Sequence, residues 1–415
     1  MLFNLNLPLY IHIFFLGFIL IDHPAVALPN FGVTAVRERF SKAFASWSLP
    51  FPSSSTSIEK RAQTLSGVNY NPNGTAFLWL PDVEYSGKTF FDTWDFFEGD
   101  DPTHFVNRSF AEDNGLISFN EQDGTVMMKA DDFTTLPMGV NRSSVRISSQ
   151  QLYTTGLFIL DLRRAPWGCA IWPAFWTLGV GPTWPQNGEI DILEGVHDNE
   201  HNQIAFHTNP GCMYDPNATF TGTIPGDPSE ANRTNCDASA RQNSGCDVVE
   251  WSQASYGPFF EQQGGGVLAM KWDENDISVW SFFRAAVPTD ITAGTPNPST
   301  WGLPSARLMN TMCDIPNFFA NHTIVFATGA DIYLILGDWA GNSYATTNCP
   351  GTCLERLMDP ANFVNATWSI NSLKVYRKEL LSGNPQPSSS SYDYDRRVAL
   401  QVILPLVAAL IFTFY

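Results

Sequence analysis

The chain has 415 residues, of which 44% are hydrophobic and 13% are aromatic. Its 41 acidic and 23 basic residues give a net charge of −18. This acidic balance disfavours nucleic acid and anionic membrane surfaces as partners, and it suits a neutral partner.

The N-terminal segment has the pattern of a secretion signal. Residues 5–21 are almost entirely apolar and are followed by Ala25, Val26 and Ala27, a small-x-small cleavage pattern. We therefore predict a signal peptide over residues 1–27 that is cut after Ala27. No Lys or Arg precedes the apolar run, so an uncleaved anchor stays open as the alternative.

Residues 28–76 are predicted to form an N-terminal arm or linker. They combine a short helix-like segment, residues 34–43, with the Pro/Ser-rich residues 50–55. Such composition is typical of connecting segments. The sequence assigns no function to this part of the chain.

Residues 77–379 are predicted to form one all-β domain. Short aromatic and β-branched runs alternate there with Gly, Pro, Asn and Asp, without a long amphipathic helical period. This pattern is typical of a β-sandwich, and about 300 residues suffice for a sizeable core. The clearest predicted strands are residues 125–128, 144–147, 156–161, 204–207, 276–283, 323–328 and 372–376.

Three carboxylates occur within six residues of one predicted strand: Glu189, Asp191 and Glu194. The residues between them are apolar and favour an extended backbone. Side chains alternate along a strand, so Glu189 and Asp191 share a face whereas Glu194 would point the opposite way. We predict a β-bulge at Ile192 and Leu193, which would return Glu194 to the face of the other two acids.

The two outer acids fit the chemistry of a retaining glycosidase. Their side chains can lean together until the carboxyl groups are ~5–5.5 Å apart, the separation that this reaction needs. We predict that Glu189 attacks the anomeric carbon, and that Glu194 protonates the leaving oxygen and later activates water. Asp191 lies between them, where like charges raise a carboxyl pKa and keep one proton shared. The alternatives are a solvated acidic edge strand or a calcium loop, although calcium loops prefer Gly, Asn and Asp between the ligands.

This strand and its flanks resemble the catalytic strand of glycoside hydrolase family 16. Residues 184–196 read WPQNGEIDILEGV. Their acid spacing, Glu-x-Asp-x-x-Glu, resembles the laminarinase-type branch, whereas lichenases and cell-wall transglycosylases of the family have Glu-x-Asp-x-Glu. Further segments recur in the same order in secreted fungal endo-β-1,3(4)-glucanases, namely residues 168–169, 172–176, 207–208, 255–258, 264–266, 313–315, 337–341 and 349–353. The resemblance runs from roughly Tyr85 to Arg377.

The resemblance implies a jelly roll of two antiparallel β-sheets with a concave substrate cleft. It also implies a retaining endo-hydrolase of β-1,3- or mixed β-1,3/1,4-glucan, without a metal or another cofactor. Two other functions stay open. A transglycosylase would make longer chains, and a non-catalytic glucan-binding protein would release no reducing sugar from laminarin, although the three intact acids argue against it.

Five further side chains are candidates for substrate binding. Trp172, Trp176, Trp184 and Trp339 could stack on the apolar faces of sugar rings. Core packing is the alternative for each of them. His207 belongs to a strand that we expect next to the catalytic one, where it could hydrogen-bond the nucleophile or the substrate.

The seven cysteines leave one thiol over if the others pair. Members of the resembled group usually carry a cysteine where this chain has Leu336. One arrangement pairs the other six and leaves Cys169 over, and we expect the leftover cysteine to be a buried, inert thiol. Cys349 and Cys353 are close enough to bridge a small loop, but the pairing is open. The six cysteines that would form three bridges are Cys212, Cys236, Cys246, Cys313, Cys349 and Cys353.

Sequons support passage through a secretory compartment. Seven Asn-x-Ser/Thr sites begin at Asn73, Asn107, Asn141, Asn217, Asn232, Asn321 and Asn365. Together with the cysteines they indicate an oxidising, extracellular route.

The C-terminal segment resembles a signal for a glycosylphosphatidylinositol (GPI) anchor. Residues 380–397 are Pro/Ser-rich and are predicted to form a stalk and spacer, and residues 398–415 are an apolar tail. Small residues at 388–390 or 382–384 are candidate attachment sites. A transmembrane helix is the alternative. We therefore expect a monomer at the cell surface that touches the membrane only through a lipid anchor.

Overall fold

The computed structural model describes residues 67–100, 103–226, 233–241, 244–329 and 343–381. The predicted signal peptide, most of the predicted arm, the stalk and the C-terminal tail lie outside these residues, as does Trp339. Asn69 and Tyr70, which we assigned to the arm, form strand β1 and pair with β2. Within the described ranges, no helix is both long and apolar enough to cross a membrane.

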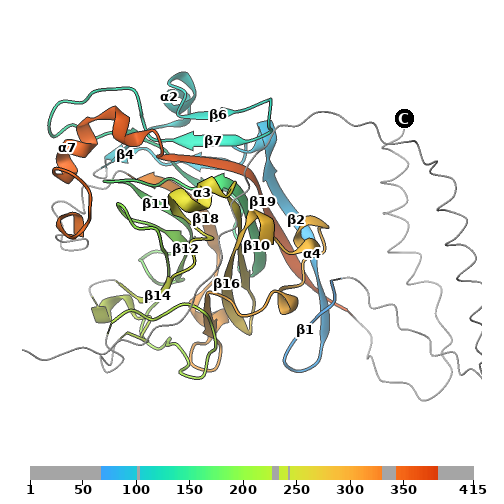
Figure 1. Cartoon of the computed structure of the whole chain (residues 1–415). Coiled ribbons are helices and arrows are strands. Elements are labelled where there is room, and N and C mark those ends of the chain that lie inside the picture. The colour runs from blue at the N-terminus through green and yellow to red at the C-terminus, as the bar shows by residue number, and fades with distance from the viewer. Residues whose placement is uncertain (1–66, 101–102, 227–232, 242–243, 330–342, 382–415) are drawn as a thin grey trace, which may run out of the picture. The chain divides into compact units, whose positions relative to one another are not determined.

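Two antiparallel β-sheets form the domain, seen in Figure 1 with β11, β12 and β18 on one side and β10, β16 and β19 on the other. Sheet A has the order β1-β2-β19-β10-β15-β16-β17, and β7 and β6 extend it from β19. Its strands are β1 (Asn69–Tyr70), β2 (Ala76–Ser86), β6 (Ile117–Phe119), β7 (Val126–Lys129), β10 (Gly156–Arg164), β15 (Gly266–Trp272), β16 (Asp276–Phe283), β17 (Ala306–Met309) and β19 (Thr367–Leu380).

Sheet B carries the acidic motif and has the order β14-β13-β12-β11-β18-β9-β3. Its strands are β3 (Trp94–Phe96), β9 (Arg146–Ser149), β11 (Trp172–Gly179), β12 (Glu189–Glu194), β13 (Asn202–His207), β14 (Cys246–Glu250) and β18 (His322–Gly329). A small sheet C consists of β4 (Gly99–Asp100), β5 (His104–Phe105) and β8 (Ser143–Ser144).

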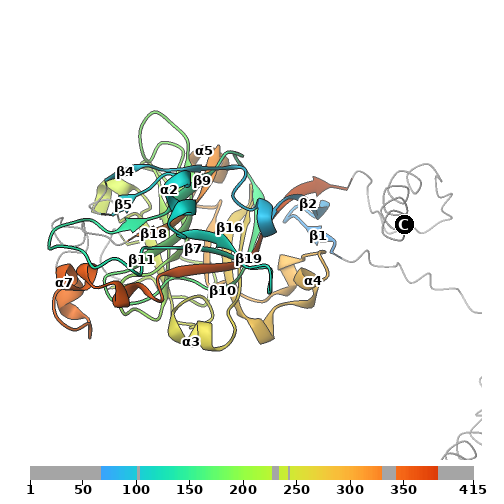
Figure 2. The same ribbon diagram turned by 90° about the horizontal axis from the view of Figure 1, so that it is seen from above.

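The described helices are short and lie at the periphery (Figures 1 and 2). They are α2 (Arg108–Asp113), α3 (Gly257–Gln262), α4 (Thr289–Thr292), α5 (Ile315–Phe318) and α7 (Cys353–Met358). Short 3-10 turns are η1 (Gly87–Thr89), η2 (Ala238–Arg241), η3 (Arg284–Ala286), η4 (Pro298–Thr300), η5 (Ser343–Thr346) and η6 (Pro360–Phe363). The prediction of an all-β sandwich is confirmed, and each of the seven predicted strands overlaps an observed one, although residues 144–147 are divided between β8 and β9.

The core lies between the two sheets, because one face of sheet B is apolar. Along β11 the buried Phe175 and Thr177 alternate with the more exposed Trp172, Ala174 and Trp176, as the period of a strand requires. Sheet A buries both faces instead. Phe158 and Leu160 of β10 belong to the main core, whereas Leu157 and Ile159 pack into a second cluster that is partly covered by Ile291 of α4 and by Trp301.

The disulfide arrangement that leaves Cys169 over is wrong. Cys169 is bonded to Cys349, and the seventh cysteine, Cys353, is a buried thiol at the start of α7. Cys353 packs in an apolar cluster with Ile171 and Leu357. The reason is tertiary, since Cys169 and Cys349 are 180 residues apart in the chain but 5.7 Å apart between their Cα atoms. The other two bridges are Cys212–Cys313 and Cys236–Cys246.

Candidate active site

The predicted bulge is present on β12. Towards β13, Asp191 is opposite Ala205 and Glu194 is opposite Gln203, so two residues of β12 face one residue of β13. The register with β11 shifts at the same place. Ile192 and Leu193 both enter the core. Glu189, Asp191 and Glu194 consequently share the opposite face of sheet B.

A tight turn before β12 sets the start of the acidic motif. Gly188 has a φ of +81°, and a Cβ atom there would lie 2.5 Å from the Phe319 ring and 2.6 Å from the Phe318 carbonyl oxygen. Only glycine fits both the conformation and the space. The Asn-Gly step thus allows the chain to turn between β11 and β12 and to enter β12 at Glu189.

The three acids line one cavity of about 170 Å³ on the outer face of sheet B. Its lining comes from β11, β12, β9, β18 and the segment around β5, and comprises Thr103, Phe105, Arg146, Trp172, Ala174, Trp176, Glu189, Asp191, Glu194 and Ala327. A larger hollow of about 420 Å³ beside Trp167 and Asn365 contains none of the three acids. We therefore place the candidate site in the smaller cavity, where the ionisable and aromatic groups converge.

Each outer glutamate accepts a hydrogen bond from a tryptophan. The Trp172 Nε1–H donates to Glu194 Oε1 at 2.9 Å, and the Trp184 Nε1–H donates to Glu189 Oε2 at 2.8 Å. Trp184 is 45% exposed. Trp176 lines the cavity and lies under the Arg146 guanidinium, 5.2 Å from the ring centre. None of these three tryptophans belongs to the buried core clusters, and their binding of sugar stays a prediction.

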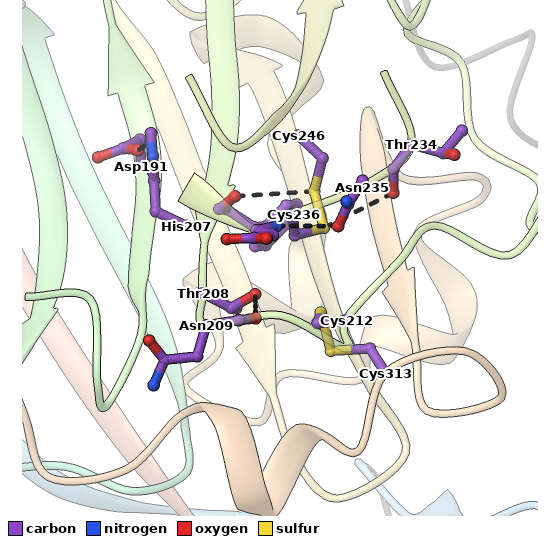
Figure 3. The surroundings of a disulfide bond; sticks show 12 residues. Asp191, His207, Thr208, Asn209, Cys212, Thr234, Asn235, Cys236, Cys246 and Cys313 are labelled. Atoms are coloured by element: carbon purple, nitrogen blue, oxygen red, sulfur yellow. Dashed lines mark hydrogen bonds and ion pairs between the residues drawn. A yellow bond between two sulfur atoms is a disulfide. The ribbon is translucent and has the colours of Figure 1, made fainter. Parts of the chain in front are cut away.

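His207 stands beside the acids, on β13. It is the register partner of Glu189, and its Nε2 lies 3.0 Å from Asp191 Oδ2 and 3.9 Å from Glu189 Oε1. Figure 3 shows the two side chains together, with the disulfides on the other side of His207. Thr208, the next residue, donates its backbone N–H to the Cys236 carbonyl, and Cys236 is bonded to Cys246 of β14. These links hold the end of β13 against the neighbouring loop.

Burial raises the pKa of both outer glutamates, and the charge of Asp191 raises it further. His207 and the indole donors act in the opposite direction, but the pKa reaches about 7 for Glu189 and about 8 for Glu194. Burial lowers the pKa of His207, yet the hydrogen bond and charge of Asp191 outweigh it and raise this pKa to about 9. The surroundings therefore favour the imidazolium form of His207 and the protonated forms of Glu189 and Glu194.

Glu189, Asp191 and His207 offer ligand atoms within 4.8 Å of one another, a spacing that could hold a metal ion. His207 is a poor ligand here, because its Nε2 faces Asp191 and its pKa is raised to about 9. A protonated imidazole nitrogen has no lone pair for a metal. That the reaction needs no metal or other cofactor stays a prediction.

The site also contains residues that sequence reasoning missed. The Arg146 guanidinium lies over two aromatic rings, 5.2 Å from the centre of Trp176 and 5.0 Å from the centre of Phe97. Its segment was predicted as a strand, and alternation with the buried Val145 and Ile147 could have indicated that Arg146 faces outward. No sequence pattern indicates that Thr103 and Phe105 face the site. They lie in and just before the short strand β5, far from the acidic motif along the chain.

Comparisons with known proteins agree with this geometry. The family model described as "XgeA-like, catalytic GH16 domain" matches residues 94–376. A protein of Schizosaccharomyces pombe named a probable glycosidase is 43% identical over 303 residues, which are 71% of this chain and 68% of that protein. An Aspergillus fumigatus protein named a probable endo-1,3(4)-β-glucanase is 37% identical over 308 residues. That match covers 71% of this chain but only 44% of the relative, so the chain spans less than half of it.

Two solved structures have the same fold. Laminarinase 16A of Phanerochaete chrysosporium, with β-glucans in its donor and acceptor sites, is 35% identical with a TM-score of 0.65, covering 72% of this chain and 99% of that one. An elongating family 16 β-1,3-glucosyltransferase is 36% identical with a TM-score of 0.64, covering 72% of this chain and all of the other. The sandwich is thus the jelly roll that the resemblance implied. With the family model matching most of the chain and its acidic strand in place, this protein belongs to glycoside hydrolase family 16 and carries its catalytic domain.

Proposed function

We propose that the protein is a retaining endo-hydrolase of β-1,3- or mixed β-1,3/1,4-glucan. One observation carries the proposal: the bulge of β12 brings Glu189 and Glu194 into the same cavity, each with an indole N–H donor. Two carboxyl groups that face one cavity are the pair that glycoside hydrolysis uses, and we propose that this pair acts by double displacement.

In the first step Glu189 attacks the anomeric carbon and Glu194 gives its proton to the glycosidic oxygen, so that the C–O bond breaks and the aglycone leaves. In the second step Glu194 takes a proton from water, and the resulting nucleophile displaces Glu189 from the sugar. The raised pKa of Glu194 supports its role as the acid, because a carboxyl group that stays protonated near neutral pH can give its proton to the glycosidic oxygen.

Asp191 and His207 would tune the two glutamates. Asp191 raises the pKa of both, and the imidazolium of His207 lowers it. Together they keep the pKa of each glutamate near neutrality, where an acid and base can exchange protons efficiently. Trp172, Trp176 and Trp184 would contribute aromatic surface for sugar rings. Trp339 stays a prediction, because it lies outside the described residues.

The substrate class is supported by the relatives. The Aspergillus fumigatus relative is named for endo-1,3(4)-β-glucan cleavage, and the Phanerochaete chrysosporium structure holds β-glucan. The cavity itself is lined by aromatic and neutral groups besides the acids and Arg146, a composition that suits an uncharged polysaccharide.

A second candidate is transglycosylation of β-1,3-glucan. The observation that favours it is the likeness to the elongating glucosyltransferase, whose TM-score of 0.64 is close to that of the laminarinase. The first step is common to both functions. In the second step a sugar hydroxyl would replace water, and Glu194 would take the proton from that hydroxyl instead.

The test is an assay of the purified protein on laminarin, lichenan and β-1,6-glucan. We expect new reducing ends from laminarin and none from β-1,6-glucan, and we expect proton NMR to detect the β-anomer first. Chains longer than the substrate would identify a transglycosylase. The absence of both activities would leave a glucan-binding protein, and initial release of the α-anomer would refute the two-step mechanism.

We also propose that the protein is secreted as a monomer and carries a GPI anchor. The three disulfides of the described domain support an oxidising compartment. Mass spectrometry of the mature protein should find neither the first 27 residues nor Tyr415, and a phospholipase specific for phosphatidylinositol should release membrane-bound protein. A mature chain that still contains Tyr415 would favour a transmembrane tail.

A further inference from the structure

The bulge that turns Glu194 into the cavity breaks the hydrogen-bond ladder between β12 and β13. A bulge leaves backbone groups of the extra residue without a strand partner. Here the affected groups are the Ile192 carbonyl and the Glu194 N–H, and both bind the side chain of Asn202. Asn202 Nδ2 donates to the Ile192 oxygen at 2.9 Å, and the Glu194 N–H donates to Asn202 Oδ1 at 2.9 Å.

Asn202 is fully buried and is oriented from its other side by Glu250. The two residues are register partners on β13 and β14. Asn202 Nδ2 lies 3.4 Å from Glu250 Oε2. The amide nitrogen thus faces two acceptors, while the amide oxygen faces the donor. Turning the amide over would place its oxygen against two oxygens, so the partners permit one orientation.

Glu250 is itself held from the opposite sheet. Its side chain is buried, with 2% of the residue exposed, and it accepts hydrogen bonds from Ser305 at 2.6 Å and from Ser281 at 2.8 Å. Ser281 lies on β16 and Ser305 immediately precedes β17, both in sheet A. A buried carboxyl group with neutral partners is costly. In this position it connects sheet A, through Asn202, to the backbone of the bulge.

We propose that Asn202 and Glu250 are positioning residues that hold the bulge of β12 and thereby aim Glu194 at the glycosidic oxygen. Asn202 touches the backbone on either side of the bulge, Glu250 orients Asn202, and neither lines the cavity. The inference rests on the proposed function, because it assigns their effect to the proton transfers of Glu194.

The first test compares two substrates in the variant Asn202→Ala. Loss of both bonds leaves the Ile192 carbonyl and the Glu194 N–H unpaired, and a displacement of about 1 Å at a catalytic group can cost about 10²-fold in rate. We expect kcat on laminarin to fall by about 10²-fold with KM changed by less than about threefold. A dinitrophenyl β-laminaribioside needs little acid assistance to leave, so its cleavage should lose far less, and azide should restore turnover of the glycosyl-enzyme.

The second test asks whether Glu250 acts through Asn202. Glu250→Ala should lower kcat on laminarin, whereas Glu250→Gln, which keeps an acceptor for the amide, should restore most of it. The double variant Asn202→Ala with Glu250→Ala should be no slower than Asn202→Ala alone. Asn371→Ala is the matched control, because it removes an amide bond to Asp161 in sheet A and should leave kcat unchanged.

The variant Asn202→Asp tests the proposal if the alanine variant does not fold. The carboxyl group that this substitution introduces can donate to the Ile192 oxygen when it is protonated, but not when it is ionised. The activity of Asn202→Asp relative to wild type should therefore rise as the pH falls. Equal losses on both substrates, full additivity of the double variant, or an Asn202→Asp profile parallel to wild type would each overturn the inference. The proposed function is judged separately, since wild type inactive on laminarin and on the aryl glycoside would refute that function.

Discussion

The acids on β10 and β12 are stabilised in opposite ways. Both strands lie inside their sheets. Asp161 of β10 receives two bonds from the Arg284 guanidinium, at 2.7 and 3.0 Å, and one from Asn371 at 2.6 Å. On β12, Glu189 and Glu194 are bonded to neutral indole donors, and the nearby cationic groups are the imidazole of His207 and the guanidinium of Arg146.

The difference separates an acid with a structural role, Asp161, from the acids of β12 that we propose to be catalytic. A dedicated guanidinium binds the carboxylate of Asp161 with two hydrogen bonds and makes it a fixed link between β10 and η3. Neither outer acid of β12 is bonded to a cation of its own, and the charges of His207 and, at Glu189, Arg146 lower their pKa only in part, so burial and the charge of Asp191 raise the pKa of Glu189 and Glu194. Because the negative charge of these acids is only partly compensated, they can exchange protons near neutral pH.

The strongest way to break the comparison is to neutralise each acid. Glu189→Gln removes the proposed nucleophile, and Glu194→Gln removes the proposed acid. We expect a loss of about 10²–10⁴-fold in kcat on laminarin for Glu194→Gln and at least as much for Glu189→Gln. Asp161→Asn should keep kcat within about twofold. Release of reducing sugar measures all three variants, and azide should rescue Glu194→Ala on an activated aryl glycoside. Near-normal turnover in either glutamine variant would remove the assignment of roles.

The second prediction concerns the positive charge of His207. The charge of His207 lowers the pKa of both glutamates. Its loss in His207→Gln should therefore raise both values, and both limbs of the pH profile of kcat/KM should move to higher pH. In wild type these limbs are macroscopic values of the pair, expected near 7 and 8. Arg284→Gln, which removes the cation of Asp161, is the control and should leave the profile in place. An unmoved or downward-shifted profile for His207→Gln would contradict the electrostatic reasoning.

The third prediction concerns the indole donors. Trp172→Phe keeps an aromatic ring but removes the bond to Glu194, and Trp184→Phe removes the bond to Glu189. Each bond lowers the pKa of its own glutamate, so the basic limb should rise in Trp172→Phe and the acidic limb in Trp184→Phe. We expect kcat to fall about tenfold in each, as for one hydrogen bond to a charged group. Trp280→Phe, which loses a bond to the Gly302 carbonyl far from the acids, is the control. Identical pH profiles in all four proteins would refute the proposed tuning.

The smallest expected effect is on stability. Because the pKa of Glu194 is raised to about 8 in the folded state, its ionisation above that pH destabilises the fold relative to the unfolded chain. Stability from this group falls as pH rises from about 4.5 to 8. Glu194→Gln should then raise Tm by about a few degrees at pH 9 and leave it unchanged at pH 4. Asp161→Asn should lower the free energy of unfolding at neutral pH by up to about 1 kcal/mol, because the pair that it breaks is partly exposed. Its Tm at neutral pH should fall slightly as a result. Calorimetry at the two pH values decides, and a lower Tm of Glu194→Gln at pH 9 would contradict the prediction.

Local patterns predicted the sandwich and the acidic strand well. The alternation of apolar and polar residues indicated most strands, and the spacing of Glu189, Asp191 and Glu194 indicated a bulge at Ile192 and Leu193, which the register confirms. These features depend on residues that are neighbours in the chain. The fold class therefore could be predicted without knowledge of long-range contacts, whereas the jelly roll was implied by the family resemblance.

Long-range relations could not be predicted in the same way. Asn202 and Glu250 stabilise the bulge from two other strands, and Arg146 reaches the cavity from β9. Cys169 forms a disulfide with Cys349, 180 residues away in the chain. From the sequence, the pairing of the cysteines stayed open. In each case residues that are far apart in the chain come into contact only after the sheets have assembled.

The sequence by itself thus determined the strand period, the position of the bulge and the common face of three acids, because side-chain direction along a strand is a local property. The tertiary structure alone decided which donors surround those acids, how far their pKa values rise and which cysteines pair. Burial and distance between remote segments set these quantities, and neither exists until sheet A covers sheet B.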